Sequence, residues 1–274
     1  MRTWLRGSMT VVGTMAAVAA CWPLLVQETA GQGVLSQMPR TADGKPDLSG
    51  VWQVVNTAQW DLQDHAASQG PVVALGAAFS VPPGHGVVEG NEIPYQPWAA
   101  AQKRENAANR LTRDPEIKCY FPGVPRVMYM PYPFQILQSP KKIVMAFEFT
   151  QAGRTIYMAA GDPPPVDTYM GQSDGRWEGN TLVVDVSGFN DKTWFDRAGN
   201  FHSDALHVVE RYTLASPNHI LYEATIEDPK VFTRPWKISM PFYRRFEKDA
   251  EVLKYKCIEF AEELMYGHLT KRPN

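Results

Sequence analysis

The sequence predicts an all-β domain whose mainly antiparallel strands close into a barrel or form a strongly curved sheet, with one helix near residues 97–111. Nine segments are rich in β-branched or aromatic residues and are bounded by Gly, Pro, Asn or Asp. The 22 Pro and 20 Gly among 274 residues favour short strands joined by turns. Because the intervals between strands are too short for repeated crossover helices, antiparallel hairpins are expected.

The first predicted strand covers residues 51–55 and follows a turn at residues 46–50. The others are expected at residues 134–138, 143–150, 154–159, 181–187, 206–214, 220–227, 236–246 and 252–260. Closure into a barrel removes the exposed sheet edges, and a small barrel has room for one organic ligand. A two-sheet sandwich remains the alternative, because its strands show the same alternation of residues.

The predicted helix at residues 97–111 has Pro97 near its first turn and many good helix formers after it. The dipeptide Asp114-Pro115 ends it, because a residue before proline avoids the helical conformation. Residues 70–91 are rich in Gly and Pro and show no sustained period. They are expected to form a long loop that is either mobile or a lid.

The first 30 residues are expected to be an export signal. Arg2 and Arg6 precede the uncharged, largely apolar stretch 7–26. Cleavage near Ala30 is favoured; lipidation of Cys21 is the alternative and is the only route by which the sequence suggests a membrane partner. Residues 31–46 would then be a linker and residues 47–274 a single domain in the periplasm or outside the cell.

The two other cysteines, Cys119 and Cys257, are expected to form a disulfide. An isolated pair in an exported chain is typical of such a bond, which here would close a loop of 138 residues. Two buried free thiols are the alternative interpretation.

The charge of the chain indicates which partners to expect. A formal net charge of -2, from 27 Lys and Arg against 29 Asp and Glu, provides no basic excess for nucleic acid. A glycine-rich phosphate loop after a strand is missing from the sequence, so no nucleotide cofactor is expected. No cofactor and no stable protein partner are predicted, and the expected partner is a small, mostly apolar organic molecule.

Two segments resemble a large family of exported bacterial β-rich proteins that has no agreed activity. They are residues 173–185, Ser-Asp-Gly-Arg-Trp-Glu-Gly-Asn-Thr-Leu-Val-Val-Asp, and residues 202–211, His-Ser-Asp-Ala-Leu-His-Val-Val-Glu-Arg. Separately, Gly50-Val51-Trp52 is similar to the Gly-x-Trp opening of lipocalin-like barrels. The first resemblance implies a family without a reaction, and the second implies a lipocalin-like barrel.

Residues 194–211 hold the densest mixture of acids, bases and histidines, and they are the predicted catalytic region. His207 or His202 is expected to act as the base, because a neutral imidazole titrates near pH 7. Asp196 or Glu210 would orient that base or act as the acid, and Arg211 would stabilise negative charge. In a regular strand His207 and Arg211 share one face and Glu210 the other; a buried pair or a solvated outer face is the alternative for His207 and Arg211.

A metal site is disfavoured by spacing. His202 and His207 are five residues apart, which places them on different sides of a helix or a strand. Ligands assembled from separate strands would still permit a zinc site.

A second predicted site is the proline-rich segment 119–126, which would hold Arg126 among aromatic side chains as a clamp for a ligand oxygen. Tyr129, Trp194 and Trp52 are expected to help bind that ligand. The alternative is a rigid loop in which Arg126 pairs with an internal carboxylate such as Asp185. Residues 176–180 are expected to form a hairpin turn.

These observations together predict an exported barrel enzyme that carries out acid/base chemistry without a cofactor. The expected reaction is an isomerisation, a dehydration or other elimination, or a cyclisation, as in lyases and isomerases. Two alternatives remain: a non-catalytic periplasmic carrier of a hydrophobic ligand, and a metal-assisted hydrolase.

Overall fold

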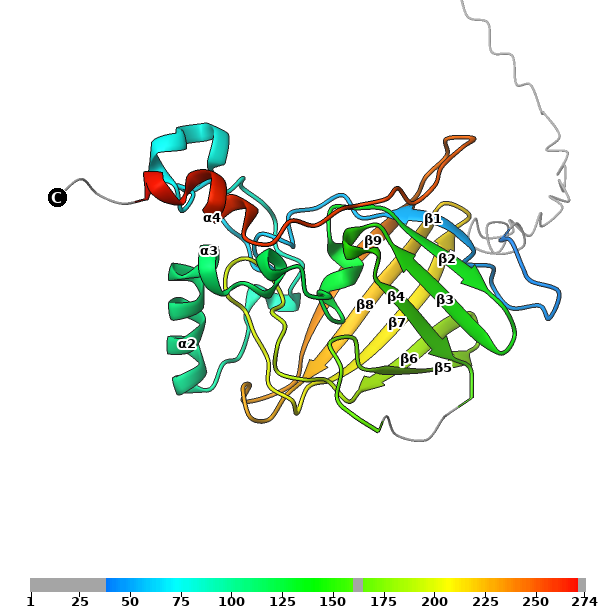
Figure 1. The fold of residues 1–274 in the computed structure, drawn as a ribbon. Helices are drawn as coiled ribbons and strands as arrows, with labels where there is room; N and C mark the ends of the chain where they lie inside the picture. The colour runs from blue at the N-terminus through cyan, green and yellow to red at the C-terminus, as the bar shows by residue number, and fades with distance from the viewer. Residues whose placement is uncertain (1–37, 160–164, 271–274) are drawn as a thin grey trace, which may run out of the picture. The chain divides into compact units, whose positions relative to one another are not determined.

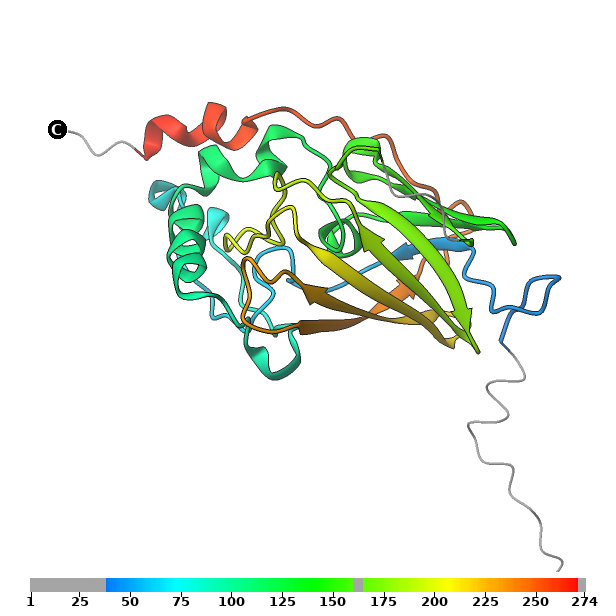
Figure 2. The ribbon, with the colours of Figure 1, turned by 90° about the horizontal axis from the view of Figure 1, so that it is seen from below.

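The computed structural model describes residues 38–159 and 165–270, and within them nine strands form one closed barrel in chain order (Figures 1 and 2). The strands are β1 (Gly50–Gln53), β2 (Phe134–Gln138), β3 (Lys142–Phe147), β4 (Gly153–Tyr157), β5 (Gln172–Glu178), β6 (Thr181–Ser187), β7 (His207–Ser216), β8 (His219–Glu227) and β9 (Trp236–Arg244). The predicted all-β, lipocalin-like barrel is confirmed. The predicted leader, including Cys21, lies outside the described residues.

Strand pairing is antiparallel around the barrel except at one seam. β1 pairs with both β2 and β9, which closes the barrel. β4 and β5 run parallel and share only the pairs Ile156 with Ser173 and Tyr157 with Asp174. The segments that join antiparallel neighbours are mostly short turns, as the sequence predicts.

One predicted strand is wrong and one strand was missed. Residues 252–260 form no strand in the structure, and most of their side chains are exposed. Because β1 and β9 already pair, the barrel offers this segment no free edge. The missed strand is β5, which includes residues 176–178 of the predicted hairpin turn, so the turn is confined to Gly179 and Asn180. Gly179 has φ +60°, which favours glycine.

The helices belong to the segments outside the barrel. They are α2 (Pro97–Ala108), α3 (Arg110–Arg113) and α4 (Ala261–Tyr266). In the described ranges, 3₁₀ helices cover Val73–Phe79, Glu89–Asn91, Pro115–Lys118, Arg126–Tyr129, Phe149–Gln151 and Gly267–Leu269. The predicted helix at 97–111 is therefore present, but it breaks at Asn109, whose side chain amide donates to the carbonyl of Glu105.

The centre of the barrel is packed with aromatic rings. Trp52, Phe134, Tyr212, Tyr222 and Phe242 are almost fully buried. Their rings lie against one another, with centroids 4.8 Å apart for Tyr222 and Phe242 and 5.3 Å apart for Phe134 and Phe242. These side chains fill the region in which the sequence analysis expected a ligand, so a binding site has to be sought elsewhere on the fold.

Helices, loops and the C-terminal tail gather beyond one end of the barrel (Figures 1 and 2). The predicted disulfide between Cys119 and Cys257 is present and fastens the tail to the segment after α3, which overturns the free-thiol alternative. The backbone amide of Phe260 also donates to the carbonyl of Ile117. None of the helices in the described ranges has the length and apolar character needed to cross a membrane.

Candidate functional site

His207 and Arg211 lie on the outer face of β7, as the alternation predicts. His207 lies between two carboxylates, with Nε2 3.0 Å from Asp185 and Nδ1 3.4 Å from Glu227. Partial burial lowers the pKa of His207, but the two carboxylates outweigh it and raise the pKa above its usual value. Arg211 donates to the exposed Glu178. The position of both residues agrees with the solvated-face alternative.

Glu210 faces the barrel interior and is fully buried. It forms an ion pair with the buried Arg154 of β4, which the sequence analysis did not single out. The hydroxyls of Tyr212 and Tyr222 each donate to Glu210 at 2.8 Å, and Arg154 also donates to Ser173. Every partner of Glu210 in this network is a buried side chain, so the network stabilises the packed centre of the barrel.

His202 is also buried, and both of its ring nitrogens are occupied. Nδ1 donates to the carbonyl of Ser203 at 2.8 Å, because a carbonyl can only accept. Nε2 then accepts from the hydroxyl of Thr193 at 2.6 Å. Burial lowers the pKa of His202. The imidazole is thus a neutral, fully hydrogen-bonded side chain with no nitrogen left for a substrate.

Arg126 forms an internal ion-pair cluster. It donates to Asp114 at 3.0 Å and to Glu116 at 2.6 Å, and its side chain is 1% exposed. The predicted alternative, in which Arg126 pairs with an internal carboxylate, is therefore confirmed. The partners are Asp114 and Glu116, however, and not Asp185. Tyr129 is buried beside this cluster, where its hydroxyl donates to the carbonyl of Phe195.

The two predicted tryptophan contacts, Trp52 and Trp194, lie in different parts of the fold. Trp52 is fully buried, donates to the carbonyl of Leu48, and has the guanidinium of Arg244 4.3 Å from its ring centroid. It therefore closes the barrel core next to β9. Trp194 is 8% exposed and lines a separate pocket on the surface.

Asp196 is the predicted site residue that leads to a pocket. It is fully buried and accepts from the backbone amides of Leu62 and Asn200. Burial and the neighbouring carboxylate of Asp61 raise the pKa of Asp196 to about 7. Two neighbours of Asp196 line a cavity: Asp61, and Arg197, which follows Asp196 in the sequence.

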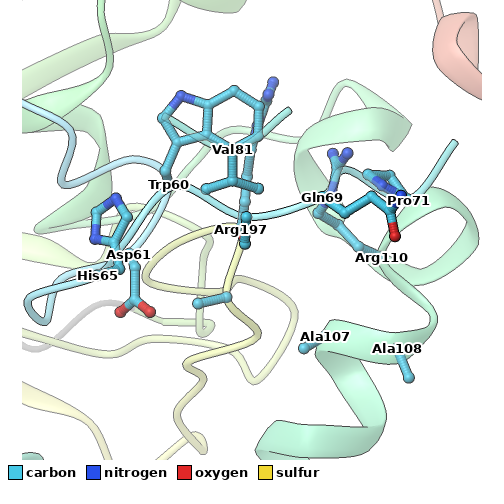
Figure 3. Close-up of a pocket in the computed structure, with 12 residues that line it drawn as sticks. Trp60, Asp61, His65, Gln69, Pro71, Val81, Ala107, Ala108, Arg110 and Arg197 are labelled. Atoms are coloured by element: carbon cyan, nitrogen blue, oxygen red, sulfur yellow. The ribbon is translucent and has the colours of Figure 1, made fainter. Parts of the chain in front are cut away.

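This cavity, here called the Trp60 pocket, has a volume of about 390 Å³. Figure 3 shows the residues that line it, and none of them belongs to a strand, so the pocket lies outside the barrel lumen. The loop after β1, the long loop at 68–81, the α2–α3 region and the loop before β7 form its walls. Its lining residues are Trp60, Asp61, His65, Ser68, Gln69, Pro71, Val81, Ala107, Ala108, Arg110, Arg197 and Ala198. The predicted lid loop thus contributes to a pocket wall.

The guanidinium groups of two arginines lie near the indole of Trp60. The guanidinium carbon of Arg197 lies 4.6 Å from the ring centroid and that of Arg110 lies 5.9 Å from it. Arg197 is held by two hydrogen bonds to Glu116, of 2.9 and 2.6 Å. Arg110 is 6% exposed and donates through Nη2 to Glu262 of α4 at 3.1 Å. Its Nη1 is buried and has no hydrogen-bond partner in the part of the chain that the structure describes.

His65 has a free nitrogen in the same pocket. Nδ1 donates to the carbonyl of Gln63 at 2.8 Å, which leaves the lone pair on Nε2 in the neutral ring. Nε2 is buried, and no described residue hydrogen-bonds to it. His65 therefore differs from His202 and His207, since one of its ring nitrogens has no hydrogen-bond partner among the described residues.

His65 and Arg110 were not among the predicted site residues. A signal was present, because Trp60, Asp61 and His65 crowd together just before the long glycine- and proline-rich loop. Within the described ranges no group of three or more His, Cys, Asp or Glu side chains is arranged to hold a metal ion.

Comparisons with known proteins add no family to this description. No protein-family profile matches the chain, and no curated protein was found to be significantly similar to it. The resemblance to exported bacterial β-rich proteins stays a prediction. The fold and the pocket define the protein as a closed nine-stranded barrel with a side-chain-lined cavity outside its lumen.

Proposed function

We propose that the protein is an exported barrel enzyme that binds a small organic molecule in the Trp60 pocket and moves a proton on it without a cofactor. The observation that carries this proposal is that His65 and Arg110 line one cavity and that Nε2 of the first and Nη1 of the second are buried without a hydrogen-bond partner among the described residues. A base and a hydrogen-bond donor for a developing oxyanion are the two groups that such chemistry requires.

The reaction class follows from these two groups. Nε2 of His65 would take a proton from a carbon next to a carbonyl, and Nη1 of Arg110 would donate to the resulting enolate oxygen. Return of the same proton to a different carbon gives an isomerisation, whereas loss of a leaving group from the enolate gives an elimination. Asp61 also lines the pocket.

His65 replaces His202 and His207 as the proposed base. Both nitrogens of His202 are hydrogen-bonded, and His207 lies outside the barrel between two carboxylates. The acid/base roles predicted for Asp196, Glu210 and Arg211 have no geometric support of this kind. The disulfide supports the proposed export, because such bonds persist in oxidising compartments.

A non-catalytic carrier is the second candidate function. It is favoured by the indole and two guanidinium groups, which can hold a ligand without any proton transfer. Catalysis and transport therefore differ in whether His65 matters for turnover.

The test uses two probes whose benzylic protons exchange with solvent, phenylpyruvate and phenylacetone. Loss of the benzylic signal is followed by NMR in D₂O with the wild-type protein, with His65→Gln and with His219→Gln. His219 is a matched control, because its imidazole is exposed. In the described chain its side chain has one hydrogen-bond partner, the hydroxyl of Ser216.

The proposal predicts faster exchange of at least one probe with the wild type and with His219→Gln, and background exchange with His65→Gln. Binding of the probes without accelerated exchange would favour the carrier. Equal exchange rates for the wild type and His65→Gln would overturn the role of His65.

A further inference from the structure

The guanidinium of Arg110 makes fewer hydrogen bonds to carboxylates than those of Arg126 and Arg197, although Nε of Arg126 is also buried without a partner among the described residues. Arg126 makes three hydrogen bonds to carboxylates and Arg197 makes two, all of 3.3 Å or less. Arg110 has Glu262 as a carboxylate partner on Nη2, while Nη1 is buried and unpartnered within the described ranges. A buried donor without an acceptor is costly, and an arginine donor gains most from a charged oxygen.

The residues that line the pocket near Arg110 determine the shape of the ligand that can supply a charged oxygen to Nη1. Trp60 presents an indole ring, and Pro71, Val81, Ala107 and Ala108 supply apolar surface around the same cavity. Figure 3 shows Trp60 and Arg197 on one side of the space and Arg110 with Gln69 on the other. A flat aromatic body packs well against an indole, because offset ring contacts add to the burial of apolar area.

The size of the cavity restricts the ligand further. A volume of about 390 Å³ is at the lower end of the roughly 300–1,000 Å³ found for small-molecule pockets. One or two fused rings with a short substituent suit such a space. The polar side chains of Ser68 and Gln69 also line the cavity and can form hydrogen bonds to a further hydroxyl or carbonyl group of the ligand.

The electrostatic balance explains why a single carboxylate is the best match. Arg110, Arg126 and Arg197 are paired with Asp114, Glu116 and Glu262, three charges of each sign. The network therefore offers hydrogen-bond donors without a large excess of positive charge. A monoanion can satisfy Nη1, whereas a phosphate or other dianion would add repulsion from these carboxylates and from Asp61.

From these observations we infer that the ligand of the Trp60 pocket is a flat aromatic monocarboxylate, whose carboxylate accepts from Nη1 of Arg110 and whose ring lies against Trp60. This inference rests on the proposed function for the location of the site and adds the substrate class. It does not need His65 to be a base, so binding and proton exchange test the two statements separately.

The experiment compares three probes by isothermal titration calorimetry with the full-length protein: 2-naphthoate, 2-naphthamide and decahydro-2-naphthoate. The amide retains the flat rings and removes the charge, and the saturated acid retains the charge and removes the flat rings. We expect 2-naphthoate to bind roughly tenfold more tightly than either of the others, since a charged hydrogen bond is about twice as strong as a neutral one.

Variants then locate the interaction. Arg110→Gln is expected to abolish the preference for 2-naphthoate over 2-naphthamide, and Trp60→Leu the preference over the saturated acid. Arg113→Gln is the matched control, because Arg113 lies on the same helix, is half-exposed and pairs with Glu105 away from the Trp60 pocket. Thermal unfolding of each variant establishes that it is folded.

Equal affinity of the wild type for 2-naphthoate and 2-naphthamide would overturn the inference, and this result does not depend on any variant. Retention of carboxylate selectivity in Arg110→Gln would overturn the role of Arg110. Selective binding of 2-naphthoate together with no proton exchange of the earlier probes would leave the ligand class standing and remove the proposed catalysis.

Discussion

The buried ion pair between Arg154 and Glu210 makes the packed centre of the barrel testable. Glu210 accepts from Arg154, from Tyr212 and from Tyr222, so Glu210→Gln removes the charge that compensates the guanidinium and places an amide donor in a ring of donors. Removing one partner of a buried pair costs about 3–5 kcal/mol, because the other charge remains buried. We expect a loss of that order in the free energy of unfolding.

The assay is urea unfolding followed by tryptophan fluorescence. The double variant Arg154→Gln/Glu210→Gln should recover part of the loss, since it leaves no uncompensated charge in the barrel. Arg211→Gln is the matched control, because the side chain of Arg211 lies on the opposite face of β7 and pairs with the exposed Glu178. It should change the free energy of unfolding little. A loss below about 1 kcal/mol for Glu210→Gln would refute this reasoning, as would a double variant no more stable than the single one.

Three further predictions concern the disulfide and two titrating groups. Replacing Cys119 and Cys257 by Ser should lower the free energy of unfolding by roughly 5 kcal/mol in the chain-entropy model, and an unchanged denaturation midpoint would contradict it. Because the folded pKa of Asp196 is about 7, above its unfolded value, its stabilisation is present at low pH and is lost as the pH rises through 7. Unfolding free energies should therefore fall by roughly 2–3 kcal/mol from pH 5 to pH 8, and Asp196→Asn should show a smaller fall. The pKa of His207, measured by NMR, should be above its usual value, and Asp185→Asn should lower it. The stabilisation by protonated His207 is lost as the pH rises through the pKa of His207 in the folded protein.

Eight of the nine strands were predictable because their residues alternate or favour the extended conformation. On β7 the pattern places His207 and Arg211 outside and Glu210 inside, as observed. Residues 252–260 have the same local composition but form no strand, because pairing needs a free neighbouring edge and the closed barrel offers none. Local propensity does not report which edges are free.

The candidate site was predictable only in part. Asp196 marks the right region, since its neighbours Asp61 and Arg197 line the Trp60 pocket. His65 and Arg110 were missed, because 45 residues separate them in sequence and the loop and helix that bring them together have no repeating pattern. The free nitrogens of these two side chains depend on hydrogen-bond partners such as the carbonyl of Gln63, which no sequence pattern specifies.

The position of a bound aromatic acid tests the central claim most directly. In a crystal structure of the protein with 2-naphthoate, we predict a carboxylate oxygen within hydrogen-bond distance of Nη1 of Arg110 and the rings against Trp60. Density for the acid inside the barrel beside Glu210, or on the outer face beside His207, would contradict the assignment of the Trp60 pocket as the functional site.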